Sequence, residues 1–258
     1  MVVKLIHRKL SIKTILVSQP KPEGDKSPYY DLAEKYKLKI DFRPFIHVEG
    51  VSVQDFRTQR VNIPEHTAVI MTSKTAVDHF FRIAEDIRFS VPDTMKYFCI
   101  SEAIALYLQK YVTYRKRKIF HGKQTIEELA EMMKKHKSDK FLLPCTDILR
   151  DKIPETLEHF KINFTKAMLY KTVASDLSDL EDVYYDLLVF FSPGGIESLF
   201  KNFPDFKQNK TMIAAFGPTT ANAVVKNNLR LDLHAPQPNV PSMTAAIENF
   251  VKESLKKK

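Results

Sequence analysis

Short apolar runs recur along this chain, and most of them end in turn-forming residues and precede a segment with helical periodicity. Such runs lie at 15–17, 68–71, 97–100, 118–120, 141–143, 187–191, 212–216 and 231–234. Short buried strands that alternate with helices are typical of βα units, in which helices cover both faces of a parallel sheet. The sequence therefore predicts an α/β fold.

Two segments interrupt this alternation. Residues 38–49 and 162–173 are longer extended patterns with a partial period of two, and no helix follows either of them directly. A chain of 258 residues is long enough for two domains of ordinary size, so we interpret the two segments as a double crossing between lobes. The predicted first lobe, linker strands and second lobe lie at 1–38 plus 174–258, at 39–49 and 162–173, and at 50–161.

Internal similarity supports the division into two lobes. Residues 69–77 parallel residues 189–197, and residues 99–105 parallel residues 215–221. We therefore expect two similar lobes, each a parallel sheet flanked by helices, joined by a two-stranded β linker. Two such lobes that faced each other would place their matching turns on a common cleft.

The charge balance favours acidic partners. A net charge of +9 is compatible with nucleic acid, an anionic membrane, or a carboxylate or phosphate ligand. The densest basic run, residues 111–118, has tyrosines among its basic residues, which is one pattern of nucleic-acid binding. It is also the pattern of a solvated loop before a short strand, and no helix-turn-helix, RNP or zinc-finger motif accompanies it.

Targeting and metal-binding patterns are weak. Charged residues interrupt the first twenty positions, and no stretch approaches the roughly 20 apolar residues of a membrane helix, so we expect a cytoplasmic protein. The two cysteines, Cys99 and Cys145, each end a predicted strand, with no CxxC pair and no histidine at ligand spacing. Disulfide, zinc and iron–sulfur sites are not predicted.

The turn after the apolar run 187–191 has the composition of an anion site. Gly194 and Gly195 permit close approach of a ligand to the backbone, and Ser192 is placed to cap the next helix and to donate a hydroxyl. Pro193 suits the first helical turn. The free N–H groups of a helix start, beyond the carboxyl end of a strand, favour anions.

A second turn, Gly217 to Thr220, repeats this arrangement. Pro218 presets the first helical turn, while Thr219 and Thr220 offer hydroxyl donors. The same residue types also occur at helix starts that bind no ligand, so a single turn of this kind is weak evidence for a binding site. The presence of several equivalent turns is what favours ligand binding. There is no GxGxxG, GxxxxGK[ST] or GxSxG motif, which argues against dinucleotide, P-loop and serine-hydrolase chemistry.

With these residues in hand, the sequence resembles the uroporphyrinogen-III synthase family. The strongest match covers residues 189–200 and 213–223 with the trailing segments 229–238 and 241–242. Weaker matches at 69–80, 141–147 and 169–172 follow in the order of the family, so that the resemblance spans nearly the whole chain. It implies two α/β lobes joined by a two-stranded ladder, with the N-terminal unit belonging to the C-terminal lobe.

The resemblance also implies an activity. Members of the family are lyases of tetrapyrrole (heme) biosynthesis that close hydroxymethylbilane to uroporphyrinogen III with inversion of ring D. Loss of the substrate's hydroxyl gives an azafulvene, which a substituted ring carbon attacks through a spiro intermediate. The substrate carries eight carboxylates, which suits helix N-termini and a positive net charge without a metal or cofactor. We expect a monomer that binds neither nucleic acid nor membrane.

The resemblance assigns residue roles by position. Tyr170 matches the tyrosine that eases departure of the hydroxyl, although a tyrosine packed at the hinge would look the same. The candidate substrate-binding residues are the hydroxyl, glycine, proline and lysine positions of the turns, namely Thr72, Ser73, Lys74, Ser101, Thr146, Ser192, Pro193, Gly194, Gly195, Pro218, Thr219 and Thr220.

One turn departs from the family pattern. Where relatives often have Gly-x-x-Thr, this chain has Ser101 and Ile104 with Glu102 between them, which loses a hydroxyl and adds an acid. A two-lobed protein that binds an anion or a tetrapyrrole without turnover would also fit this departure. That alternative and nucleic-acid binding through residues 111–118 remain open at this point.

Overall fold

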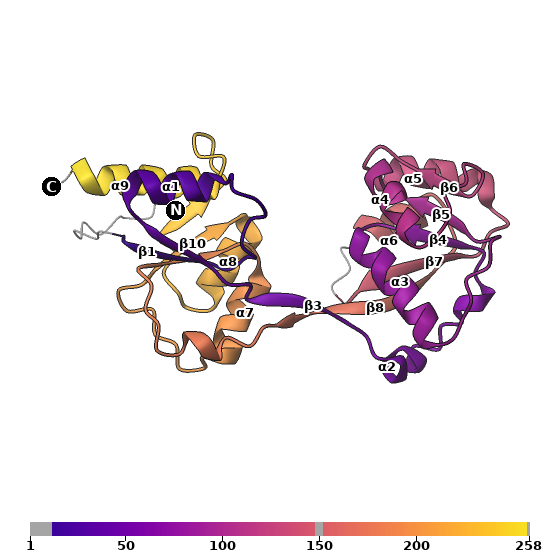
Figure 1. The fold of residues 1–258 in the computed structure, drawn as a ribbon, viewed down its shortest axis with the longest axis horizontal. Coiled ribbons are helices and arrows are strands. Elements are labelled where there is room, and N and C mark those ends of the chain that lie inside the picture. The colour runs from indigo at the N-terminus through magenta and orange to yellow at the C-terminus, as the bar shows by residue number, and fades with distance from the viewer. Residues whose placement is uncertain (1–11, 148–151, 257–258) are drawn as a thin grey trace. The chain divides into compact units, whose positions relative to one another are not determined.

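The chain folds into two compact units, each with its own sheet (Figure 1). The structure, a computed structural model, describes residues 12–147 and 152–256. One unit combines residues up to 47 with those from 173 onward, and the other comprises residues 48–172. Parallel sheets flanked by helices make up both units, which confirms the predicted α/β class.

The first sheet has five strands in the order β11-β10-β9-β1-β2, and every neighbouring pair is parallel. Its strands are β1 (Thr14–Val17), β2 (Lys39–Phe42), β9 (Leu187–Phe190), β10 (Met212–Phe216) and β11 (Leu233–Ala235). Its helices are α1 (Pro28–Tyr36), α7 (Pro193–Asn202), α8 (Pro218–Lys226) and α9 (Met243–Lys256).

Alternate residues of these strands pack on opposite faces of the sheet. Ile15 and Val17 belong to the core beneath α1 and α9, whereas Leu16 belongs to the core beneath α7 and α8. This is the period of two that a strand imposes on its side chains. Helices on both faces therefore require strands that are apolar throughout, as the runs in the sequence are.

The second sheet has six strands in the order β3-β8-β7-β4-β5-β6. Its strands are β3 (Ile46–Gly50), β4 (Ala68–Met71), β5 (Lys96–Cys99), β6 (Ile119–His121), β7 (Phe141–Thr146) and β8 (Phe164–Ala174). Its helices are α2 (Val53–Thr58), α3 (Lys74–Asp86), α4 (Glu102–Tyr107), α5 (Ile126–Met133) and α6 (Lys152–His159).

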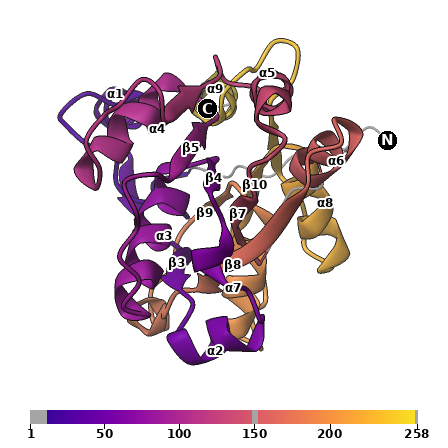
Figure 2. The ribbon, with the colours of Figure 1, turned by 90° about the vertical axis from the view of Figure 1, so that its right-hand side faces the viewer.

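Two cores sandwich this second sheet. Side chains of α2, α3 and α4 pack on one face, and those of α5 and α6 pack on the other. Figure 2 shows the strands between these two groups of helices. Short 3-10 turns complete the described secondary structure, at Ile63–Glu65, Leu108–Lys110, Lys134–His136 and Ser178–Leu180.

The predicted extended segment 38–49 is two strands rather than one. β2 lies in the five-stranded sheet and β3 lies in the six-stranded sheet. Pro44 separates them, because proline lacks the N–H that a continuous ladder needs. The neighbouring Phe45 is 1% exposed and packs edge-on against Phe190, with ring centroids 5.5 Å apart. The break is therefore fixed by a core contact.

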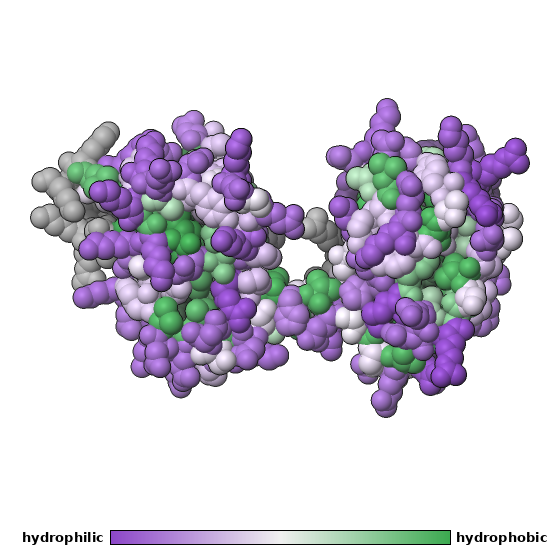
Figure 3. All heavy atoms as spheres, viewed as in Figure 1, coloured by the Kyte–Doolittle hydropathy of each residue, from purple (hydrophilic) through white to green (hydrophobic). Residues whose placement is uncertain are grey.

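Hydrophilic residues cover most of the visible surface of each unit (Figure 3). Among the helices of the described residues, none combines the length and apolar character that crossing a bilayer demands.

A buried carboxylate ties strands of the second sheet together at their amino ends. Asp139, whose side chain is 8% exposed, accepts a hydrogen bond from the Thr67 hydroxyl at 2.9 Å. Its other oxygen receives the Lys96 ammonium at 2.6 Å. One side chain thus links the first residue of β5 to the segments that precede β4 and β7.

We predict that Asp139→Ala lowers the free energy of unfolding by about 2–3 kcal/mol, because it leaves the partly buried Lys96 ammonium and the Thr67 hydroxyl without their acceptor. Urea unfolding followed by circular dichroism measures the change. The control is Glu131→Ala, which removes an exposed pair with Lys134 and should cost about 0.5 kcal/mol or less. Equal losses in the two variants would contradict the assignment.

Candidate active site

The strand order singles out one location on each sheet. In the second sheet β5 and β6 lie on one side of β4, while β7 and β8 lie on the other. In the first sheet the same reversal occurs between β1 and β9. Open α/β sheets bind ligands outside the carboxyl ends of their strands at such a reversal. The turns that follow β4, β7, β1 and β9 are therefore the prime candidates.

The turn after β4 contributes three of the predicted residues. Ser73 is the N-cap of α3, and its hydroxyl oxygen accepts a hydrogen bond from Ala76 N at 3.0 Å. Thr72 and Ser73 are half-buried, whereas Lys74 is exposed and places Nζ 5.2 Å from the centroid of the Tyr107 ring. A cation and two hydroxyls thus stand at a helix N-terminus, where anions are favoured.

Tyr170 lies beside this turn. A register shift after Cys145 pairs Thr146 of β7 with Tyr170 of β8. The tyrosine is 9% exposed, and burial raises the pKa of its hydroxyl, while a hydrogen bond with Ser73 opposes that rise. The structure therefore brings Ser73, Thr146 and Tyr170 together at the β4–β7 reversal.

Thr146 has an acidic neighbour. The Thr146 hydroxyl donates to Asp147 Oδ1 at 2.6 Å. Asp147 Oδ1 also accepts a hydrogen bond from Thr172 N at 3.2 Å. The proton of Thr146 is therefore engaged within the protein, and its oxygen is left as an acceptor. The hydrogen bond with Ser73 lowers the pKa of Tyr170, so Ser73 donates to the phenol oxygen, and of the grouped hydroxyls that of Tyr170 is the better placed to donate.

A histidine that the sequence did not single out packs on Tyr170. The rings of His79 and Tyr170 stack with centroids 5.2 Å apart and planes 20° from parallel. Arg82 Nε donates to His79 Nδ1 at 3.1 Å, and its terminal nitrogen donates to the carbonyls of Val51 and Leu169. No spacing signal marks His79, because the contact depends on where β8 lies beside α3.

Burial lowers the pKa of His79, and the Arg82 charge lowers it further, against an opposing effect of Asp78. A neutral ring that accepts at Nδ1 carries its proton on Nε2. The Tyr170 ring is therefore held against a flat, uncharged neighbour.

Ser101 is not part of this group. It occupies the N-cap position of the six-residue helix α4, makes no capping hydrogen bond, and follows β5 rather than a strand at the reversal. The adjacent Glu102 is exposed. Ser101 therefore lies one strand away from the turn that carries Ser73.

The turn after β9 differs from the expectation for Ser192. This residue is the N-cap of α7, but its side chain caps no amide; its carbonyl oxygen accepts from Gly195 N at 3.2 Å instead. A Cβ on Gly195 would lie 3.2 Å from the Phe190 ring and 3.7 Å from Ser18 Oγ. Gly195 thus permits close packing against β9 and β1, and Ser18 joins this turn as a residue that sequence reasoning missed.

Gly194 and Pro193 differ from Gly195 in being partly accessible. A Cβ on Gly194 would meet Ile46 side-chain atoms at 3.6 and 3.8 Å, which are ordinary contact distances. The fold itself therefore does not require glycine at 194. A role in admitting a ligand to the backbone is a separate reason for glycine at this position.

In the turn after β10, one of the two threonines is accessible to solvent. Gly217 has φ +84°, a conformation that favours glycine, and its N–H donates to Ala235 O at 2.7 Å. Pro218 and Thr219 are exposed, whereas Thr220 is 1% exposed. The accessible groups at this helix start are therefore the backbone and the Thr219 hydroxyl.

The described residues contain no group of three His, Cys, Asp or Glu side chains arranged to hold a metal ion. Cys99 and Cys145 are both buried free thiols. Burial raises the pKa of Cys99 to about 12 and also raises that of Cys145. Neither thiol is activated as a nucleophile at neutral pH.

The sequence is similar to those of known proteins over most of its length. The protein-family model described as uroporphyrinogen-III synthase HemD matches residues 27–245. The chain belongs to the uroporphyrinogen-III synthase family. A uroporphyrinogen-III synthase of Saccharomyces cerevisiae is 27% identical over 139 residues, which are 48% of this chain and 50% of the yeast protein. The match thus spans about half the length of that curated relative.

A solved structure shares the fold. The crystal structure of a uroporphyrinogen-III synthetase from Helicobacter pylori 26695 aligns with a TM-score of 0.56 at 17% identity, covering 94% of this chain and all of the other. The resemblance drawn from residues 189–200 and 213–223 is confirmed by the family match.

We predict that Arg82→Gln raises the pKa of His79 toward its ordinary value of 6.5, because it removes the nearby positive charge while burial persists. Titration of the imidazole carbons by NMR measures the shift. Because folding weakens proton binding at His79, the stability from this residue is present above pH 6.5 and is lost as pH falls below that value. Arg60→Gln, which changes an exposed arginine on another element, is the control. Identical titrations of His79 in both variants would refute the contact with Arg82.

Proposed function

We propose that this protein is a cofactor-free uroporphyrinogen-III synthase that closes hydroxymethylbilane to uroporphyrinogen III with inversion of ring D. The observation that carries the proposal is the grouping of Ser73, Thr146 and Tyr170 at the β4–β7 reversal of a chain in this family. The reaction asks a protein to help a hydroxyl depart and to hold a flexible polyanion in one conformation. Both tasks fit the groups at these turns.

Tyr170 is the proposed donor to the departing hydroxyl. Because burial raises its pKa above the ordinary value of 10, the phenol keeps its proton throughout the neutral range. A hydrogen bond or proton delivered to the hydroxymethyl oxygen lets it leave as water and gives the azafulvene. The substituted carbon of ring D then attacks, and the spiro intermediate reopens and closes with the ring inverted.

Ser73 and His79 position this tyrosine. The Ser73 oxygen accepts from Ala76 N, so the serine is anchored to the first turn of α3 while it meets Tyr170. The flat contact with His79 limits rotation of the tyrosine ring. A donor fixed before substrate binds loses little entropy on reaching the transition state.

The carboxylates of the substrate are the proposed partners of the helix starts. In one unit these are Thr72, Ser73 and Lys74 at the N-terminus of α3. In the other they are the backbone of residues 192–195 at α7 and the turn 218–220 at α8, with Thr219 as the accessible hydroxyl. Free backbone N–H groups suit carboxylates, and the net charge of +9 favours approach of an octa-anion.

We infer that the enzyme works as a cytoplasmic monomer on a freely diffusing small molecule, with no nucleic acid or membrane as partner. Segments 39–49 and 162–173 are proposed to join the lobes 1–38 plus 174–258 and 50–161. Ser101 has the least support among the proposed substrate contacts, because it follows β5, which is not one of the two strands at the reversal.

The first test generates hydroxymethylbilane in situ, adds the protein, oxidises the product and resolves the type I and type III porphyrin isomers. We expect type III from the wild type and a loss of kcat of about 10²–10⁴ in Tyr170→Phe, the usual contribution of a positioned acid. Tyr185→Phe removes the hydroxyl of another buried tyrosine, which bonds Asp41, and should retain activity. Type I product alone would overturn the proposed function, and full turnover in Tyr170→Phe would overturn the role of Tyr170.

The second test concerns Gly194. Gly194→Ala introduces a methyl group at ordinary contact distances, so the free energy of unfolding should change by no more than about 1 kcal/mol. If substrate carboxylates approach this backbone, the methyl group should raise KM about tenfold and leave kcat nearly unchanged. Glu197→Ala, on an exposed position of the same helix, is the control. Unchanged KM in Gly194→Ala would remove this residue from the binding site.

A further inference from the structure

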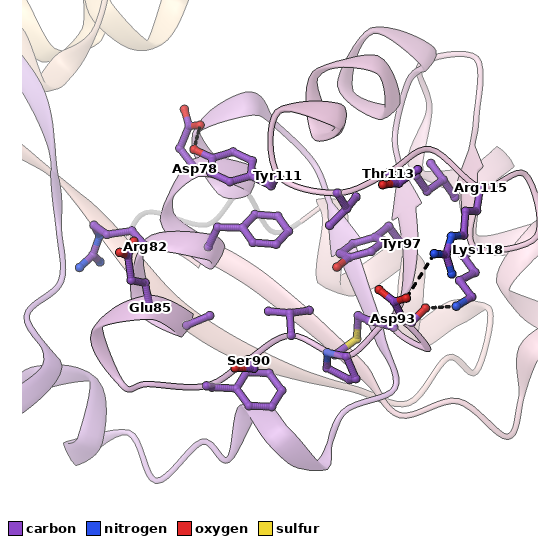
Figure 4. A pocket seen from close by; sticks show the side chains of 18 of the residues that line it. Asp78, Arg82, Glu85, Ser90, Asp93, Tyr97, Tyr111, Thr113, Arg115 and Lys118 are labelled. Atoms are coloured by element: carbon purple, nitrogen blue, oxygen red, sulfur yellow. Dashed lines mark hydrogen bonds and ion pairs between the residues drawn. The ribbon is translucent and has the colours of Figure 1, made fainter.

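The unit that holds Tyr170 has a pocket that the proposed reaction does not use. The pocket has a volume of about 830 Å³ and is bounded by the second half of α3, the loop 88–95 and the basic run 111–118 (Figure 4). Pockets of roughly 300–1,000 Å³ are typical of small-molecule sites.

This pocket lies at the opposite edge of the sheet from the candidate active site. Its lining residues Met95 and Lys118 come immediately before β5 and β6, whereas Ser73 and Thr146 stand at or after the carboxyl ends of their strands. In a parallel sheet these are opposite edges. A ligand here would not occupy the place proposed for hydroxymethylbilane.

One wall of the pocket is a preformed aromatic surface. The rings of Phe81 and Tyr111 stack at a centroid distance of 4.4 Å with planes 5° apart. The Tyr111 hydroxyl donates to Asp78 at 2.6 Å, which fixes the ring. Tyr111 is therefore part of a pocket wall rather than a free platform for nucleic-acid bases. Flat apolar walls accept planar ligands with little reorganisation.

Tyr97 supplies an unused polar group. Its side chain is 4% exposed, and its hydroxyl points into the pocket (Figure 4). Within residues 12–147 and 152–256, no hydrogen-bond partner is found for this hydroxyl. A phenol hydroxyl that opens to a cavity and makes no hydrogen bond within the described residues is free to donate to, or accept from, an atom of a ligand.

The charges around the pocket favour an anion. Four cationic side chains line it, against three acidic ones, in the set Arg82, Arg88, Arg115, Lys118, Asp78, Glu85 and Asp93. Arg115 pairs with Asp93 at 3.2 Å, and Arg82 pairs with Asp86 at 2.7 Å. Among the described residues no acid pairs with Arg88, which is exposed in the loop that follows α3.

From this geometry we propose that the pocket binds a small planar aromatic anion. The aromatic ring packs along the wall formed by Phe81 and Tyr111, a polar atom of the ligand bonds the Tyr97 hydroxyl, and the acid group pairs with Arg88. The acid is a carboxylate or a phosphate, which share this chemistry. The inference goes beyond the proposed function and does not depend on it.

Calorimetric titration of the full chain with 2-naphthoate, 2-naphthyl phosphate and the neutral 2-naphthalenemethanol tests the proposal. We expect the anions to bind with a Kd of about 0.1 mM, the strength that ligands of this size reach, and the neutral compound to bind at least tenfold more weakly. Tighter binding of the phosphate would identify a phosphate ester as the natural class, and tighter binding of the naphthoate a carboxylate. No binding of either anion at millimolar concentration, or equal binding of the neutral compound, would overturn the proposal.

Variants locate the site. Tyr97→Phe loses no intramolecular hydrogen bond, so it should leave stability unchanged and weaken naphthoate binding about fivefold. Tyr114→Phe, on an exposed tyrosine outside the pocket lining, is its control. Wild-type affinity in Tyr97→Phe would overturn the assignment.

The sign of the charge effect is tested separately. Arg88 has φ +59°, which asparagine tolerates, so Arg88→Asn removes the charge without backbone strain and should weaken binding about fivefold. Arg60→Asn, at φ +55°, is the matched control. Glu85→Gln removes an acid from the lining and should tighten binding about twofold. Tighter binding in Arg88→Asn together with weaker binding in Glu85→Gln would mean that the site selects a cation and would overturn the proposal.

Discussion

The pairing of β7 with β4 on one side and with β8 on the other is the interaction on which the candidate active site depends. Hydrogen bonds along the parallel ladders fix the register, and the shift after Cys145 sets Thr146 opposite Tyr170. The same pairing brings β8 to the side of α3, where His79 can lie on the tyrosine ring. Residues almost a hundred positions apart in the chain therefore become neighbours because of strand pairing. Their side-chain contacts then determine only the detailed geometry.

Much of the fold was predictable from the sequence for a simple reason. A strand covered on both faces must be apolar at every position, so the runs that became β4 and β9 were visible without any knowledge of the rest. The segment 38–49 was harder. Its partial alternation fits a single strand, and only the core contact of Phe45 beside Pro44 shows why the chain changes sheet there.

The sequence identified the turns that could contribute to the site, but it did not show which of these turns lie next to one another. Composition marked Ser73, Ser101 and Thr146 equally, because each follows an apolar run. Strand order separates them, since Ser101 follows β5 and the other two flank the reversal. Strand order depends on long-range pairing, which local patterns do not encode. The capping role expected of Ser192 was wrong for a related reason: the carbonyl of the same residue makes the turn, and the hydroxyl is not needed.

The discontinuity of the first sheet bears on how the chain is made. β1 pairs with β9, so Ile15 finds its partner Leu187 only after the whole of the other unit has been synthesised. Residues 48–172 can collapse on the ribosome as a continuous block, while the apolar residues of β1 and β2 remain without the neighbour that buries them. Assembly of the first unit must therefore wait until the second unit has been translated.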